Sequence, residues 1–185
     1  METQEILDLI RNSSFSRAAA HKSDIHFKRF IKGLLQYTNN GDDENLEDIF
    51  KAVPAFQRDN DKWTLAMKQS FIKNVIMGYR TTVLLYEIES SESRWNLLNE
   101  CKIIDGLQRI SAIYEFMTGE FTVFGKDYDA LVRENILHVS AAPIGIKIYI
   151  FKSEKEAIEF YISINENISH SKDDIDRARQ VLASL

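Results

Sequence analysis

The chain has few of the residues that build covalent or metal-based frameworks. It contains one cysteine, Cys101, and two prolines among 185 residues. A single cysteine excludes an internal disulfide and a metal site built from several cysteines, and it suits a reducing compartment. The N-terminus, Met1 to Glu5, is acidic and no long apolar run follows it. We therefore expect a cytoplasmic protein with no signal peptide and no membrane span.

The chain also has fewer positively than negatively charged residues. The 23 lysines and arginines are outnumbered by 28 acidic residues, which gives a formal net charge of -5. Proteins that bind duplex DNA unaided are usually basic over at least one face, so direct nucleic-acid binding is disfavoured. No spacing of histidines suits a metal, and the acidic stretch 42–48 lacks the ligand pattern of a calcium loop. We expect no metal site of that kind.

The length and the hydrophobic content of 44% predict a single domain, residues 1–185, with a real core. Apolar residues at helical spacing predict helices at 3–12, 24–37, 65–77, 107–117, 127–135, 153–165 and 171–182. Apolar or alternating runs predict strands at 49–53, 81–88, 102–104 and 144–151, with a weaker one at 121–124. The fold class that follows is α+β: a small mixed sheet surrounded by helices, with residues 1–40 forming two extra N-terminal helices.

The central stretch of the sequence is the passage from the strand at 102–104 through Asp105 and Gly106 into a helix. The first N–H groups of a helix carry partial positive charge, and they face whatever lies beyond the strand end. Gly106 has no side chain, so a ligand can approach the backbone closely. Arg109 adds a forked cation suited to a phosphate or a carboxylate. These features predict an anion site.

A purely structural explanation of the same residues stays open. Asp105 is a good N-cap, and Gln108 three residues later completes the pattern of a capping box. Arg109 could then pair with a carboxylate. Asn165, at the end of another predicted helix, can cap that end or contact a ligand.

Three motifs occur in order along the chain. Residues 53–58 read Val-Pro-Ala-Phe-Gln-Arg and are followed by Trp63; residues 105–109 read Asp-Gly-Leu-Gln-Arg; residues 163–165 read Ser-Ile-Asn. This combination resembles the N-terminal domain of GmrSD-type restriction endonucleases, over a core from about 49 to 179. The resemblance implies a ParB/sulfiredoxin-like fold, in which a Gly-x-x-Arg turn at a helix start holds nucleotide phosphates.

The resemblance also implies site residues. Asp105 and Arg109 would be catalytic, with Asp105 orienting water or a Mg²⁺ ion. The remaining positions would bind an NTP whose base the sequence does not identify: Gly106, Gln108, Arg58, Gln57 and Asn165. Leu107 and Ser163 stand where the family usually has glutamine and arginine, so binding is expected to survive more readily than hydrolysis.

The resulting hypothesis is an NTP-binding and NTP-hydrolysing module related to restriction and anti-phage defence. At 185 residues it would lack the HNH nuclease domain usual in the family. One alternative is a catalytically silent phage or defence-cluster effector that acts on a larger protein partner or nuclease subunit. A second alternative is a DNA-binding or nicking module using Arg58, Lys62 and Lys68.

Overall fold

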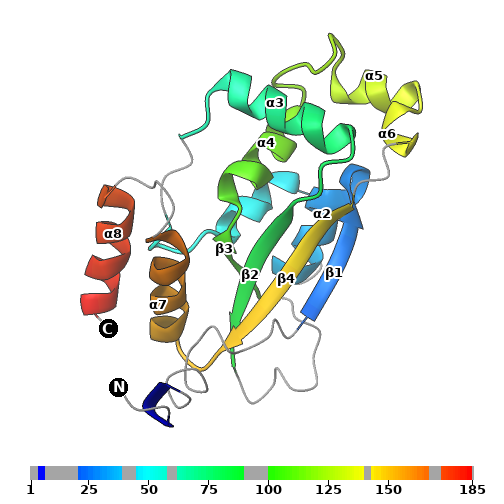
Figure 1. Ribbon diagram of the computed structural model, residues 1–185. Helices are drawn as coiled ribbons and strands as arrows, with labels where there is room; N and C mark the ends of the chain where they lie inside the picture. The colour runs from blue at the N-terminus through cyan, green and yellow to red at the C-terminus, as the bar shows by residue number, and fades with distance from the viewer. Residues whose placement is uncertain are drawn as a thin grey trace.

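The fold is built on one mixed sheet of four strands, in the order β1-β4-β2-β3 (Figure 1). The computed structural model describes residues 4–6, 21–38, 45–57, 62–89, 100–139, 143–166 and 172–184. The elements are β1 (His21–His26), η2 (Phe27–Arg29), α2 (Phe30–Thr38), η3 (Leu46–Ala52), α3 (Leu65–Ile76), β2 (Thr82–Ile88), β3 (Lys102–Asp105), α4 (Leu107–Met117), α5 (Tyr128–Arg133), α6 (Ile136–Val139), β4 (Pro143–Phe151), α7 (Glu154–Asn165) and α8 (Lys172–Ala183).

The two central strands, β4 and β2, run parallel, and each outer strand is antiparallel to its neighbour. Parallel neighbours need a long connection, and here the chain between β2 and β4 supplies β3, α4, α5 and α6. The predicted α+β class and mixed sheet are confirmed.

The sheet has two unequal faces. On the first face, alternate β4 residues Ile144, Ile146 and Ile148 are buried with Val83 and Leu85 of β2. Helices α2, α3 and α4 pack over this face and supply the larger part of the core. On the second face, α7 and α8 cover a smaller cluster that includes Tyr86, Ile104 and Phe151. Among the described residues, no helix covers the other end of this second face, where a cavity lies.

Local sequence signals fix several boundaries as predicted. The Thr64 hydroxyl accepts a hydrogen bond from the Met67 N–H at 3.3 Å and begins α3. The Ser153 hydroxyl does the same for the Glu156 N–H at 3.3 Å and begins α7. Gly78, at φ 108°, follows the end of α3, where L residues with a side chain are strained.

The predicted helix at 24–37 is wrong in its first part. Residues 21–26 form β1, which pairs along its whole length with β4, and α2 begins only at Phe30. Ile25 packs from the strand onto Gly33, where an added Cβ would lie 2.5 Å from the Ile25 Cδ1 atom. Of the helix predicted at 3–12, only residues 4–6 are described, and these are helical.

Two predicted strands are also wrong. Residues 49–53 lie mostly in the 3-10 helix η3, where Ile49 and Ala52 are buried three residues apart. Asn45 begins that helix by accepting a hydrogen bond from the Glu47 N–H at 3.2 Å. Pro54 therefore follows a 3-10 helix rather than a strand. Within 121–124, only an isolated bridge between Val123 and Lys126 forms.

Candidate functional site

The turn between β3 and α4 is closed by its backbone rather than by a capping side chain. Gly106 is the N-cap residue, at φ 103°, and makes no side-chain cap. Asp105 is the last residue of β3, and its carboxylate accepts a hydrogen bond from Arg109 Nη2 at 2.6 Å. Gln108 Oε1 accepts instead from the Trp63 N–H at 3.2 Å. The capping box expected from Asp105 and Gln108 is therefore a wrong prediction.

Arg109 is held by three acceptors. Besides Asp105, it donates to the Thr82 carbonyl and to the Thr81 hydroxyl, the latter at 3.3 Å. Its side chain keeps 25% of its surface exposed and that of Asp105 keeps 29%. The guanidinium thus ties the first turn of α4 to the start of β2 while one side of the ion pair still meets solvent.

Gly106 has a structural reason to be glycine. Its φ lies in the left-handed region, and a Cβ built there would lie 3.0 Å from Val83 Cγ2. Val83 belongs to the buried face of β2, so it cannot move far. The close approach at this glycine is made by a neighbouring strand.

The three predicted amide side chains are buried. Gln57 Nε2 donates to the Ile104 carbonyl at 3.2 Å, which places Gln57 directly beside the turn. The main-chain carbonyl of Gln57 accepts a hydrogen bond from Arg177 Nη1 of α8 at 3.2 Å. Asn165 Nδ2 donates to the Tyr161 carbonyl of its own helix at 2.7 Å. Gln57 and Gln108 therefore join the turn to neighbouring segments, whereas the Asn165 contact stays within α7.

Of the other residues singled out by the sequence, one is not described and one lies elsewhere. Arg58 lies outside the described residues. Lys68, suggested for a DNA-binding alternative, donates to both carboxylate oxygens of Glu115 at 2.6 and 2.7 Å. That ion pair links α3 to α4 and neutralises the lysine, so Lys68 does not offer a free charge to DNA.

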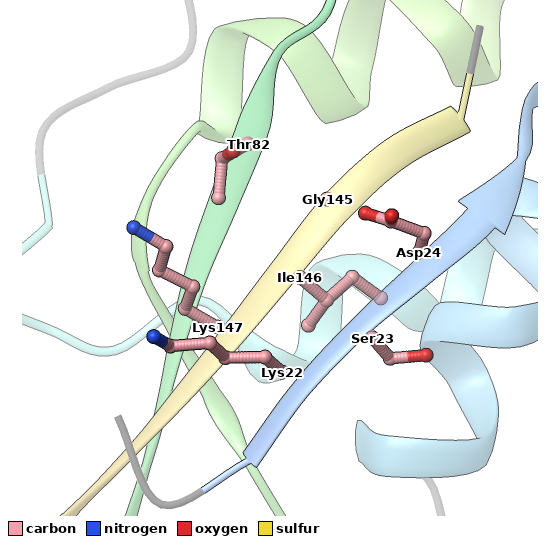
Figure 2. Close-up of a pocket in the computed structure, with 7 residues that line it drawn as sticks. All are labelled: Lys22, Ser23, Asp24, Thr82, Gly145, Ile146 and Lys147. Carbon is pink, nitrogen blue, oxygen red and sulfur yellow. The ribbon is translucent and has the colours of Figure 1, made fainter. Parts of the chain in front are cut away.

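A cavity lies next to the ion pair, on the open end of the second sheet face. Its volume is about 290 Å³. Figure 2 shows the residues that line it, from three neighbouring strands: Lys22, Ser23, Asp24, Thr82, Gly145, Ile146 and Lys147. Because Thr82 both lines the cavity and accepts from Arg109, the cavity adjoins the turn that the sequence singled out.

The strand register places the charges in a row. Lys22 pairs with Lys147, Lys147 with Leu84, and Leu84 with Asp105. Neighbouring strands are about 4.8 Å apart, so Lys147 lies about 10 Å from the backbone of Asp105. The two lysine side chains extend toward the β2 side in Figure 2. Within the described ranges, neither amine forms an ion pair.

The floor of the cavity is open because residue 145 is a glycine. A Cβ built on Gly145 would lie 2.9 Å from Thr82 Oγ1 and 3.5 Å from Asp24 Oδ1. The two oxygens therefore flank a strip of bare backbone. Reasoning from the sequence missed Lys22, Lys147 and Gly145, because only the register between distant strands brings them together. A glycine inside a predicted strand was the one available signal.

The sequence model of the GmrSD restriction endonuclease N-terminal domain matches residues 15–183. The chain belongs to that family. No curated protein and no solved structure matches it. Membership places the GmrSD-type chain in the context of restriction and defence.

The part of the chain that the structure describes holds no group of three or more His, Cys, Asp or Glu side chains arranged for a metal. Among the same residues, no helix combines the length and the apolar character needed to cross a bilayer.

Proposed function

We propose that this GmrSD-type domain binds a nucleoside triphosphate over the open end of the second sheet face. The observation that carries the proposal is the pair of lysines, Lys22 and Lys147, directly opposite each other on adjacent strands beside a cavity. Like charges in that position are destabilising. An anion bound between them converts the repulsion into attraction.

A triphosphate suits this arrangement better than a single small anion. The row runs from Lys22 through Lys147 toward the Arg109 and Asp105 pair, so its backbone positions span three strand spacings, about 14 Å. Arg109 is already oriented by Thr82 and Thr81, and it has solvent-exposed surface left. In this proposal the lysines hold phosphates and Arg109 keeps the edge of the site rigid.

The other motif residues act as supports. Gln57 and Gln108 anchor neighbouring backbone to the turn that carries Asp105 and Arg109. Their buried amides thereby set the position of the charged pair. Gly106 lets the turn before α4 pack against Val83 of β2 without a clash.

A Mg²⁺ ion fits this site as a companion of the phosphates. Protein-bound Mg²⁺ is usually held by one or two carboxylates together with substrate phosphates. Asp24 lines the cavity and forms no ion pair among the described residues, whereas Asp105 is engaged by Arg109. Asp24 is therefore the carboxylate that would hold the ion, which when bound would neutralise phosphate charge.

Hydrolysis is a separate part of the proposal and depends on Asp105. Its carboxylate accepts a hydrogen bond from Arg109 through one oxygen and is partly exposed, so the carboxylate is accessible to a water molecule. Asp105→Asn keeps the shape and removes the negative charge. We expect the variant to bind nucleotide as tightly as the wild type or more tightly, because Arg109 is no longer neutralised, and to release no phosphate.

The experiment is a thermal-shift titration of ATP, GTP, CTP and UTP with Mg²⁺, together with a phosphate-release assay. Ligand binding stabilises the folded state, and hence raises the melting temperature, by an amount that grows with the logarithm of the ligand concentration divided by its Kd. Lys147→Ala should melt at or above the wild-type temperature without ligand, because a repulsion is removed. It should also lose roughly tenfold or more in affinity, as expected for a lost hydrogen bond to a charged group.

The matched control is Lys155→Ala, which removes an exposed lysine of α7 that does not line the cavity. It should bind nucleotide as the wild type does. Absence of stabilisation by all four nucleotides contradicts the binding proposal. Equal affinities in Lys147→Ala and Lys155→Ala contradict the assigned location. Binding without phosphate release refutes only the hydrolysis step.

A further inference from the structure

The free edge of β1 presents an ordered row of main-chain groups. β1 is the outermost strand of the sheet in Figure 1, and it pairs only with β4 among the described strands. The Gly145 N–H donates to Thr81, so Gly145 directs its main-chain groups toward β2. Its neighbours Ile144 and Ile146 must therefore direct theirs toward β1.

This alternation determines which β1 residues face outward. Ile146 pairs with Ser23 and Ile144 with Ile25, so these β1 residues use their N–H and C=O groups on β4. The intervening residues Lys22 and Asp24 direct theirs away from the sheet, and His26 directs its N–H the same way while its C=O begins η2. A partner strand would find three regularly spaced residues with which to form a ladder.

A groove runs beside this edge. It has a volume of about 510 Å³ and lies between β1 and the outer side of η2 and α2. Its lining includes residues 23–26 of β1 and, from α2, Gly33 and Tyr37. Tyr37 is held in place by a hydrogen bond between its hydroxyl and His21 Nε2 at 3.2 Å.

The groove is basic although the chain is acidic overall. Arg29 and Lys32, one helical turn apart, line it with exposed side chains. Neither forms an ion pair in the part of the chain that the structure describes. Asp24 is the single carboxylate of the lining, so the positive charges prevail locally.

We propose that the edge of β1 accepts an extended, acidic segment of a partner protein by strand addition. Main-chain hydrogen bonds to Lys22, Asp24 and His26 would supply affinity, and Arg29 with Lys32 would select acidic side chains. A second copy of β1 is a poorer occupant. Antiparallel pairing through the same three residues places Asp24 opposite the same residue of the second copy, and like charges there repel.

The experiment measures fluorescence anisotropy of a short labelled peptide that alternates glutamate with valine, added to the full chain. The comparison peptides carry lysine in place of glutamate, or N-methyl groups on alternate backbone nitrogens. We expect the acidic peptide alone to bind. Reversing the groove charges in Arg29→Glu with Lys32→Glu should weaken it roughly tenfold or more.

A matched pair of variants isolates the main chain. Asp24→Pro removes an outward N–H, which an edge strand tolerates, while Asp24→Ala removes the same carboxylate and keeps the N–H. We expect Asp24→Ala to bind the peptide and Asp24→Pro to lose it, with both melting cooperatively. If Asp24→Pro does not fold, the N-methylated peptide decides the same question.

Several results would overturn the inference. Equal binding of the acidic and basic peptides, or unchanged binding of the N-methylated peptide, would contradict it. Displacement of the acidic peptide by a short DNA duplex would assign the groove to phosphates. A concentration-dependent dimer that excludes the peptide would assign the edge to a second copy. Lys147→Ala should leave peptide binding intact, so this test stands apart from the nucleotide test.

Discussion

Gly106→Ala is expected to destabilise the domain even without a ligand, because the structure explains this glycine by packing. The left-handed φ of 103° costs a residue with a side chain about 1–2 kcal/mol. The added Cβ, 3.0 Å from Val83 Cγ2, brings a further cost of about 1 kcal/mol, at the low end for overpacking. For a chain of this length, each kcal/mol lowers the melting temperature by roughly 2–4 °C.

Gly119→Ala is the matched control, since Gly119 follows the other end of α4. It has φ 85°, yet a Cβ there would meet nothing within 4 Å. The control should therefore show the backbone cost alone, and Gly106→Ala should melt about 2–4 °C below it. Differential scanning calorimetry without nucleotide measures both. A Gly106→Ala protein that melts like the wild type and fails only to bind nucleotide would refute the packing explanation.

Three further predictions concern side chains inside the described fold. Lys68→Met should lower the free energy of unfolding, measured with urea, by about 1–2 kcal/mol, because it breaks a mostly buried ion pair between two helices. The effects of Lys68→Met and Glu115→Gln should not add, because both remove the same ion pair. Glu87→Gln should raise the melting temperature by roughly 2–4 °C at neutral pH, since one carboxylate oxygen is buried without a partner. Burial, and then the nearby Glu100, raise the pKa of Glu87 above its ordinary value of 4.5. The free-energy penalty for burying the charged carboxylate is therefore complete above the raised pKa and absent below pH 4.5. The higher melting temperature of Glu87→Gln should disappear below pH 4.5. Burial also raises the Cys101 pKa to about 12, so iodoacetamide at pH 8 should label the native thiol only slowly and the denatured thiol rapidly.

The fold was predictable where the sequence pattern is local. Runs such as 82–88 and 143–151 are long and β-branched, and hydroxyl caps at Thr64 and Ser153 mark their helices directly. The N-terminal strand was not predictable in this way. Residues 21–26 have no strong alternation of their own, and only their pairing with β4 along the whole strand makes them β1.

The candidate site was also predictable only in the part that depends on local sequence. The sequence left open that Arg109 pairs with a carboxylate, but it did not identify Asp105, four residues earlier, as the partner. The lysine pair could not be found, because Lys22 and Lys147 are far apart in the chain and become neighbours only through strand register. Gln57 and Gln108 were found as motif residues, but their burial and backbone contacts depend on tertiary packing.

The most direct test of the account is an amide NMR titration of the isotope-labelled chain with a nucleoside triphosphate and Mg²⁺. The account predicts that the largest shifts occur at Thr82, Gly145 and Lys147, which line the cavity, with smaller shifts at Asp105. Shifts confined to other parts of the molecule, or no shifts at saturating nucleotide, would contradict it.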